Sequence, residues 1–431
     1  AAARCGSERG AGGSLLISKG PAAGISPIRG IDRRTEKAEF CNKNRMKRIF
    51  YTFAFLLSGV GAASAQGVGD YAAFLSDVAA RSPQLAAADK GHAATVRGLR
   101  TGLAPDDPEV GLEYYFTGES RYEIAVEQAF DFPTLYHQRN RISKLGVTKA
   151  EQEYRSARRA IMGSVSEAYL ALNYTTERVG ILTRRRDDLR RAVSLYREAV
   201  EAGHRSVIDL RNTQMMLTEV ENSLALAETE RVEASAVLAQ LNGGREIVPQ
   251  GYPQFGFTGT REEFVEAALA ADFDLRAVAV DTLIAQRELK LSRQAWIPKL
   301  KVGYKVEIEG SKGTNALLAG ISLPLWQNSG RTRHARAQDA AARAQHAATE
   351  SELRTHLQTL HARYTALSAA LAAREGDRTG TDYPELLKQS VEAGNLTSID
   401  ALLGLDEWYA LKDSLMELEY EVARAGAAMA L

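Results

Sequence analysis

One ten-residue stretch decides how this chain is organised: VEAGHRSVID, residues 200–209, recurs as VEAGNLTSID, residues 391–400. The two copies lie 191 residues apart. Phe132-Pro133 and Leu323-Pro324 are separated by the same offset. The repeated Val-Glu-Ala-Gly, the repeated Ile-Asp and the repeated apolar-Pro pair are three features at one spacing. They indicate that the chain is a duplication, with two halves of similar design.

Each copy of the motif predicts a helix that ends and reverses into another helix. Gly adopts the left-handed conformation that closes a helix, and Ser or Thr three residues later is a good N-cap. An Asp three residues after that cap completes a capping-box pattern. The residues in these roles are Gly203, Ser206 and Asp209 in the first tip, and Gly394, Thr397 and Asp400 in the second. In the simplest interpretation, both acids only cap and complement the helix dipole.

Two pairs of segments alternate apolar and ionic residues with period two, which is typical of strands with two different faces. The first pair spans 109–116 and 122–130, and the second lies around 302–308 and 317–323. Strands of about 9–11 residues can cross a bilayer when tilted. The residues expected to face lipid are Leu112, Tyr114, Ile124, Val126, Val302, Tyr304, Val306, Leu317 and Ile321. The alternation also fits two soluble hairpins with one face on a core. If the apolar face contacts lipid, arginine should be costly at Ile124 and mild at Glu123.

Long stretches with almost no Pro and few Gly predict two very long helices, at 138–199 and 331–391. About 60 helical residues make a rod of roughly 90 Å, for which a compact domain has no use. Gly and Pro near 374–384 predict a break in the second rod. Shorter helices are predicted at 74–103, 206–241 and 264–295. The Gly-containing segment 242–260 is expected to link a first repeat, 66–241, to a second, 261–431.

The segment 46–65 has the pattern of a secretory signal peptide, with Lys47 and Arg48, an apolar run, and a small-residue cleavage site before Gln66. The apolar run of about a dozen residues is short for the alternative, a membrane anchor, which needs roughly 20. Residues 1–45 lack periodicity and are expected to be disordered or an upstream extension of the reading frame. Export is the expected fate of the remainder.

Composition excludes several classes of function. Cys5 and Cys41 both precede the expected cleavage site, so no thiol remains for a disulfide, a metal or a nucleophile. The 54 basic and 54 acidic residues give no sign of a nucleic-acid partner. No run of 18 or more apolar residues follows the signal, so a membrane crossing would have to use strands.

An enzyme is the first alternative, and the sequence offers no motif for one. It has no G-x-S-x-G elbow, no H-E-x-x-H, no phosphate-binding loop and no dinucleotide fingerprint. His356 and His361 are five residues apart, which does not suit metal ligands on one helix face. His204 lies at a tip and is expected to be solvated. No catalysis, resident metal or cofactor is expected.

The order of strand pairs and long helices, the repeated tip motif, and the Pro after each strand pair together resemble the TolC-like outer-membrane efflux family. The resemblance covers 71–428 and is nearest to the metal and multidrug efflux branch. It implies a mainly helical fold, in which duplicated hairpins form an α-barrel. It also implies that three chains contribute four strands each to a twelve-stranded transmembrane β-barrel.

The family's function implies the partners. The resemblance implies a homotrimer in outer-membrane lipid that extends into the periplasm. There it would meet a periplasmic adaptor and an inner-membrane pump. It would act as a passive exit duct for small molecules or metal ions. The adaptor would contact the tips at Gly203, Ser206, Gly394 and Thr397. Asp400 matches an acid that rings the pore entrance, and Asp209 matches an acid that tethers the closed tips.

This sequence departs from the family at three tip positions. Leu403 stands where the family has a second entrance acid, and Val391 and Leu396 stand where it has a tether tyrosine and arginine. The resemblance therefore implies that this chain holds its tips together in another way. The remaining alternative is a periplasmic coiled-coil adaptor or a filament, but an adaptor has one hairpin and not two, each with its own strand pair.

Overall fold

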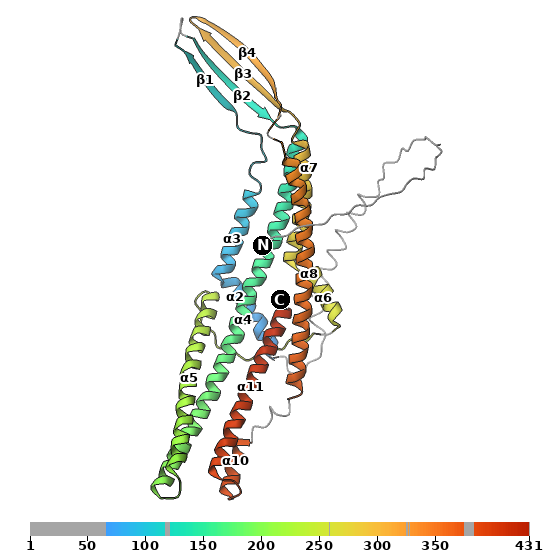
Figure 1. Cartoon of the computed structure of the whole chain (residues 1–431). Helices are drawn as coiled ribbons and strands as arrows, with labels where there is room; N and C mark the ends of the chain where they lie inside the picture. Colours follow the sequence, from blue (N-terminus) through green and yellow to red (C-terminus); the bar gives the residue numbers. More distant parts are fainter. Residues whose placement is uncertain are drawn as a thin grey trace, which may run out of the picture. The chain divides into compact units, whose positions relative to one another are not determined.

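The computed structural model describes residues 66–116, 121–257, 259–324, 326, 328–374 and 383–430, so the expected signal peptide and the segment before it lie outside the described residues. The first half contains α2 (Gln66–Arg81), α3 (Pro83–Gly98), β1 (Glu109–Tyr115), β2 (Arg121–Phe130), α4 (Pro133–Glu201) and α5 (Val207–Leu241). The second half contains α6 (Arg261–Ala271), α7 (Phe273–Gln294), β3 (Lys299–Glu309), β4 (Lys312–Ser322), α8 (Arg331–Ala372), α10 (Tyr383–Glu392) and α11 (Ser398–Ala430). The same order of elements therefore occurs twice (Figure 1).

The predicted helices are confirmed in kind and corrected in extent. The first rod is longer than predicted, because Pro133 begins α4 in the first turn, where proline is well accommodated. The second rod ends at Ala372 and α10 begins at Tyr383, while most of the predicted break, 375–382, lies outside the described residues. Two helices predicted as continuous are divided, at Ser82 before Pro83 and at Asp272, whose carboxylate caps α7 by accepting the amide of Leu275 at 2.8 Å.

The four strands form one antiparallel sheet in the order β1-β2-β3-β4, so β1 and β4 are its edges (Figure 1). The central pairing joins the two halves of the chain, with Ile124 opposite Val306. Leu112 of β1 lies opposite Ile124 of β2, and Leu317 of β4 lies opposite Tyr304 of β3. Because opposed residues point to the same side of a sheet, the apolar residues of all four strands share one face.

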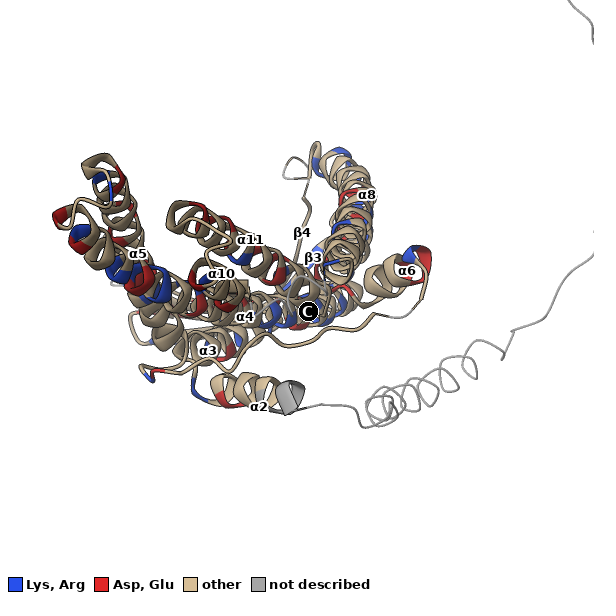
Figure 2. Cartoon of the chain, turned by 90° about the horizontal axis from the view of Figure 1, so that it is seen from below, with Lys and Arg blue, Asp and Glu red and all other residues tan. Residues whose placement is uncertain are grey.

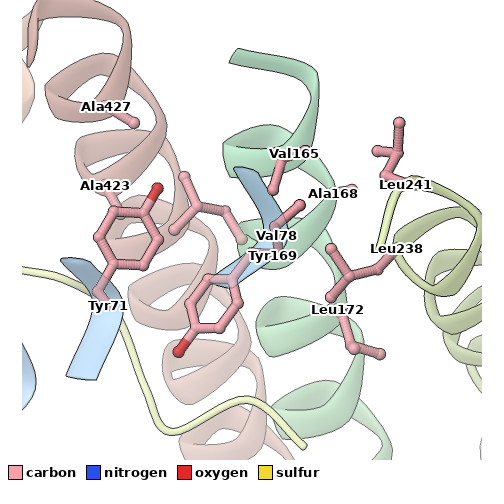
Figure 3. Close-up of a cluster of buried hydrophobic side chains, with 11 residues drawn as sticks. Tyr71, Val78, Val165, Ala168, Tyr169, Leu172, Leu238, Leu241, Ala423 and Ala427 are labelled. Atoms are coloured by element: carbon pink, nitrogen blue, oxygen red, sulfur yellow. The ribbon is translucent and has the colours of Figure 1, made fainter. Parts of the chain in front are cut away.

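The helices pack pairwise along α4, which contacts both α5 and α7, while α11 contacts both α4 and α8. The largest core cluster lies where α2, α4, α5 and α11 meet, and includes Val78, Val165 and Leu238 (Figure 3). A second cluster between α4 and α5 contains Leu189 and Val220. These clusters stabilise the helices, because tertiary packing contributes more to helix stability than intrinsic propensity does.

The segment that connects α5 to α6 is held against α4 by its backbone. The amide of Gln250 donates to the Tyr169 hydroxyl at 3.1 Å, and the amide of Gly251 donates to Asn173 Oδ1 at 3.0 Å. Two α4 side chains therefore fix the path of this connection across the helix.

Within the residues that the structure describes, no helix is both long enough and apolar enough to cross a membrane.

Candidate functional site

The sheet exposes the face that a soluble protein would bury. On the apolar face, Leu112 is 70% exposed and Leu317 is 83% exposed. On the ionic face, Glu123 is only 6% exposed. A contiguous exposed apolar surface normally marks contact with another apolar phase or with a partner. The burial pattern therefore disfavours the alternative of two soluble hairpins resting their apolar face on a core.

The ionic face is joined across the strands by ion pairs. Glu123 on β2 pairs with Lys305 on β3, and Arg121 pairs with Glu307 at 2.5 Å. Lys301 lies 3.8 Å from Glu127. Opposite charges across neighbouring strands stabilise the sheet and neutralise the charges that this face brings together.

Glu123 is not the permissive position that the alternation predicted. Its carboxylate is buried and paired with the Lys305 ammonium, so arginine there would place two cations side by side. Removal of one partner from a buried pair leaves an uncompensated charge, which is strongly destabilising. We therefore expect arginine at Glu123 to be costly, and not mild as the alternation alone predicted.

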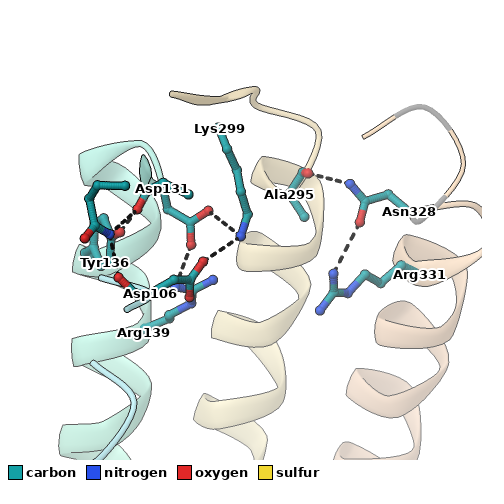
Figure 4. Close-up of polar contacts among 10 residues, drawn as sticks. Asp106, Asp131, Tyr136, Arg139, Ala295, Lys299, Asn328 and Arg331 are labelled. Atoms are coloured by element: carbon teal, nitrogen blue, oxygen red, sulfur yellow. Dashed lines mark hydrogen bonds and ion pairs between the residues drawn. The ribbon is translucent and has the colours of Figure 1, made fainter. Parts of the chain in front are cut away.

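A polar junction fixes the sheet to the helices, and no sequence motif indicated it (Figure 4). Asp131 follows β2 with its side chain only 4% exposed, and it pairs with Arg139 of α4 at 2.7 Å. Lys299, at the start of β3, lies 3.5 Å from Asp131 and 3.1 Å from Asp106. Asn328, between β4 and α8, contacts the end of α7, because its side-chain amide donates to the carbonyl of Ala295. The orientation of the sheet therefore depends on charge-assisted contacts made where strands become helices.

Both tips have the helix-reversal geometry that the repeated motif predicts. Gly203 and Gly394 have φ values of +75° and +73°. The amide of His204 donates to the carbonyl of Ala199 at 2.8 Å, and the amide of Asn395 donates to the carbonyl of Ser390 at 2.9 Å. These bonds over five residues, with glycine in the left-handed region, are the Schellman closure of a helix.

The two caps differ in detail. At the second tip, the Thr397 hydroxyl accepts the amide of Asp400 at 3.2 Å and donates to the Asp400 carboxylate at 2.5 Å. At the first tip, the Ser206 hydroxyl accepts the amide of Ile208 at 3.1 Å, one residue earlier than a capping box with Asp209 would require. The carboxylate of Asp400 is thus engaged locally, as the capping interpretation expects, although its side chain remains exposed.

Tyr196 and Arg205 bring the two tips together, and the sequence analysis did not single out either residue. The Arg205 guanidinium lies over the Tyr196 ring at 5.7 Å and donates to the Ser398 hydroxyl at 3.3 Å. Burial raises the pKa of Tyr196, the Arg205 guanidinium lowers it in part, and the carboxylates of Asp209 and Asp400 raise it. Both predicted tip acids are therefore close enough to Tyr196 to affect its pKa.

A pocket of about 620 Å³ lies between α4, α10 and α11 near these tips. Val391, at the position where the family has a tether tyrosine, is one of its lining residues. Charged residues of both signs lie along the helices when they are viewed from the tip end (Figure 2). The apolar residues that line the pocket include Leu195, Tyr196, Leu387, Val391, Leu402 and Leu405.

The described part of the chain contains no group of three or more His, Cys, Asp and Glu side chains that could hold a metal ion.

Comparisons with known proteins agree with this geometry. Residues 74–244 match the family model described as outer membrane efflux protein. No curated protein matches the sequence. The CmeC outer membrane channel of Campylobacter jejuni has a TM-score of 0.67 at 15% identity, over 84% of each chain. The open state of the MtrE outer membrane channel of Neisseria gonorrhoeae has a TM-score of 0.66 at 17% identity, over 82% of this chain and 86% of that one.

A third solved structure, a membrane protein from Pseudomonas aeruginosa, has a TM-score of 0.69 at 14% identity, over 82% of this chain and 91% of that chain. At these identities the likeness is one of fold: long paired helices that carry a four-stranded sheet. The fold is therefore the one seen in these outer membrane channels. The match to the outer membrane efflux protein family covers residues 74–244, so this part of the chain is similar to that family.

Proposed function

We propose that this protein works as a homotrimer that forms a passive exit duct from the periplasm through the outer membrane. The observation that carries the proposal is the sheet, whose apolar face is exposed and whose edges, β1 and β4, are open in one chain. An open edge leaves backbone groups unpaired, which is not tolerated in hydrocarbon. Three chains of four strands would close the edges as a barrel of twelve strands.

In this arrangement the apolar face contacts lipid and the ionic face lines water. Lipid-facing and lumen-facing residues alternate along the strands of a membrane barrel, as they do in this sheet. The nine residues from Leu112 to Ile321 named above all lie on the apolar face by strand register. The paired charges of the opposite face then remain solvated or neutralised.

The tips are proposed to meet a periplasmic adaptor, which connects the duct to an inner-membrane pump. Both tips end in tight glycine reversals, and Gly203, Ser206, Gly394 and Thr397 are all exposed. A water-filled lumen needs little recognition of its own, so the pump rather than this chain would select the small molecules or metal ions that pass.

We expect the detergent-solubilised protein to be a trimer, because the barrel closes only between chains. Mass measurement of the purified protein, corrected for bound detergent, should give three chains. A monomer that retains its full strand content by circular dichroism would contradict the proposal. Solubility without detergent after removal of 1–65 would instead favour the alternative of a periplasmic adaptor or filament.

Asp400→Asn tests whether this acid is part of the channel entrance. If three copies of Asp400 ring a narrow entrance, their charges attract cations, so the Asn variant should show lower cation preference and weaker block by multivalent cations. Single-channel recordings on purified protein measure both quantities. Asn retains some local hydrogen bonding to Thr397, so the cap is largely kept.

Asp89→Asn is the matched control, because Asp89 is an exposed acid on α3, remote from the tips in the chain. It should leave cation preference and block unchanged. If Asp400→Asn also leaves them unchanged and only lowers the unfolding temperature slightly, Asp400 is a capping residue and the entrance acid lies elsewhere.

A further inference from the structure

Two exposed tryptophans lie at the helix end of the sheet. Trp296, between α7 and β3, is 50% exposed, and Trp326, between β4 and α8, is 82% exposed. At the opposite end of the sheet, Tyr114 and Phe116 are 50% and 92% exposed, and their rings pack edge to face at 5.0 Å. Exposed aromatic side chains at both ends of an apolar band are typical of the two interfaces between lipid and water.

The length of the strands locates the headgroup layer at the same level as the tryptophans. β3 and β4 have 11 residues each. At about 3.3 Å per residue and a tilt of about 45°, such a strand spans roughly 25 Å, which is the height of the apolar band of a membrane barrel. The headgroup layer is about 5–8 Å deep on each side of the hydrocarbon. If the sheet lies in lipid, this layer begins where the strands become helices (Figure 1).

Three exposed arginines lie at this level. Arg293 is next to last in α7, and Arg333 and Arg336 lie in the first two turns of α8. At 1.5 Å per residue, the distance along the helix from the start of α8 to Arg336 is about 7.5 Å, which is within the depth of a headgroup layer. We call these three arginines, together with Trp296 and Trp326, the interface belt.

Within the described residues, no acidic side chain pairs with the three arginines of the belt. Asp339 of α8 is engaged by Arg343 at 3.1 Å. Glu288 lies on another side of α7 from Arg293, since five helical positions turn the chain by about 140° beyond a full turn. The charges of the belt are therefore available to a ligand.

The position of two of these arginines in α8 is unfavourable without an anion. The first turn of α8 contains no acidic residue, and its N-cap, Gly330, has no side chain to accept an amide. Arg333 and Arg336 therefore add positive charge to the positive end of the helix dipole. An anion bound beside them would remove this repulsion.

We propose that the interface belt binds acidic phospholipids of the periplasmic leaflet, with its arginines on the lipid phosphates and its indole rings among the headgroups. This inference rests on the proposed channel function, which puts the apolar face of the sheet in lipid. Guanidinium groups match the geometry of phosphate oxygens, and indole rings are suited to the boundary between an apolar and an aqueous phase. A lipid with net negative charge is preferred over a zwitterionic one, whose own cation offsets the attraction of its phosphate.

The test measures the quenching of tryptophan fluorescence by brominated lipids, with the purified full-length protein in vesicles. The chain has three tryptophans, so a Trp408→Phe background leaves only the two of the belt. Mixed vesicles of phosphatidylglycerol and phosphatidylcholine are prepared twice, with one lipid or the other brominated, and the two quenching curves give the preference of the belt for the acidic lipid. We expect a preference of about fivefold at low salt, since one cation near the membrane surface contributes about 1 kcal/mol. The preference should fall toward one at high salt.

The triple variant Arg293→Gln/Arg333→Gln/Arg336→Gln should lose the preference and keep the quenching, because both indole rings remain. The matched control is Arg211→Gln/Arg231→Gln/Arg245→Gln, which removes three exposed arginines from α5 and the segment after it. Since the control leaves the helix end of the sheet unchanged, it should retain the preference of the parent protein.

The belt is refuted if the parent protein is quenched equally by both lipids at low salt, or if both triple variants lose the preference to the same extent. It is also refuted if the first variant keeps the preference but changes the ion selectivity of single channels, which would place the arginines in the lumen. Inorganic phosphate that competes better than chloride at equal ionic strength would assign the arginines to a soluble anion instead. The salt dependence of the parent protein needs no arginine variant, so a variant that fails to assemble does not decide the result.

Failure of the proposed function has a different signature. If neither brominated lipid quenches the fluorescence, the helix end of the sheet does not lie at a membrane surface, and the channel proposal fails with the belt. Equal quenching by both lipids refutes only the preference for acidic phospholipids.

Discussion

Arginine in place of Ile124 is expected to prevent most of the protein from inserting stably into the outer membrane. Ile124 lies near the middle of β2, between Leu112 on β1 and Val306 on β3, so its side chain sits within the apolar face. Arginine near the middle of a lipid-facing strand costs about 2–4 kcal/mol. Because each trimer would contain three such substitutions, the effect on assembly should exceed that of one site.

The measurement is the amount of trimer in isolated outer membranes, together with the denaturant midpoint of the purified protein in lipid vesicles. The matched control is Thr314→Arg, which places the same side chain on the ionic face of β4, opposite Glu307. Thr314 is exposed and its new neighbour is an acid, so we expect near-normal insertion. Equal loss at both positions would show that the facing is reversed or that the sheet does not lie in lipid.

Leucine in place of Gly426 is expected to displace the connection between the two halves from α11. A Cβ atom added at Gly426 would lie 2.6 Å from Phe255 Cδ2 and 2.9 Å from Phe255 Cβ. The Phe255 carbonyl also accepts the Tyr364 hydroxyl of α8 at 2.5 Å, so the residue cannot withdraw without loss of that bond. Overpacking of this kind costs about 1–3 kcal/mol and sometimes more.

The expected signs are a lower unfolding temperature and faster proteolysis within 242–257. Phe255→Ala in the same chain should recover much of the loss, because it removes the group that clashes. Gly91→Leu is the matched control: it is also a helical glycine, and nothing lies within 4 Å of its added Cβ. There the better helix propensity of leucine should stabilise α3 slightly. If Gly426→Leu is as well tolerated as Gly91→Leu, the connection is not held at this point.

Local signals predicted the secondary structure well because they act within a few residues. The tip glycines, the alternation of the strands and the length of α4 each follow from backbone preference or periodicity. The division at Ser82 was also readable, since a proline follows it. The division at Asp272 was harder to find, because an aspartate cap looks like any acid in a helical stretch until its side chain is seen on the amide of Leu275.

The sequence by itself therefore determined the duplication, the two kinds of strand face, the helix reversals and the resemblance to a family. Only the tertiary structure decided which face of the sheet is exposed, that Glu123 is buried against Lys305, and that Arg185 meets Asp406. Periodicity states which residues share a side but not what that side contacts. The partners in each ion pair are separated by more than a hundred residues, so no local preference encodes their meeting. Their contacts arise when β2 pairs with β3 and α4 packs against α11, which brings the two halves of the chain together.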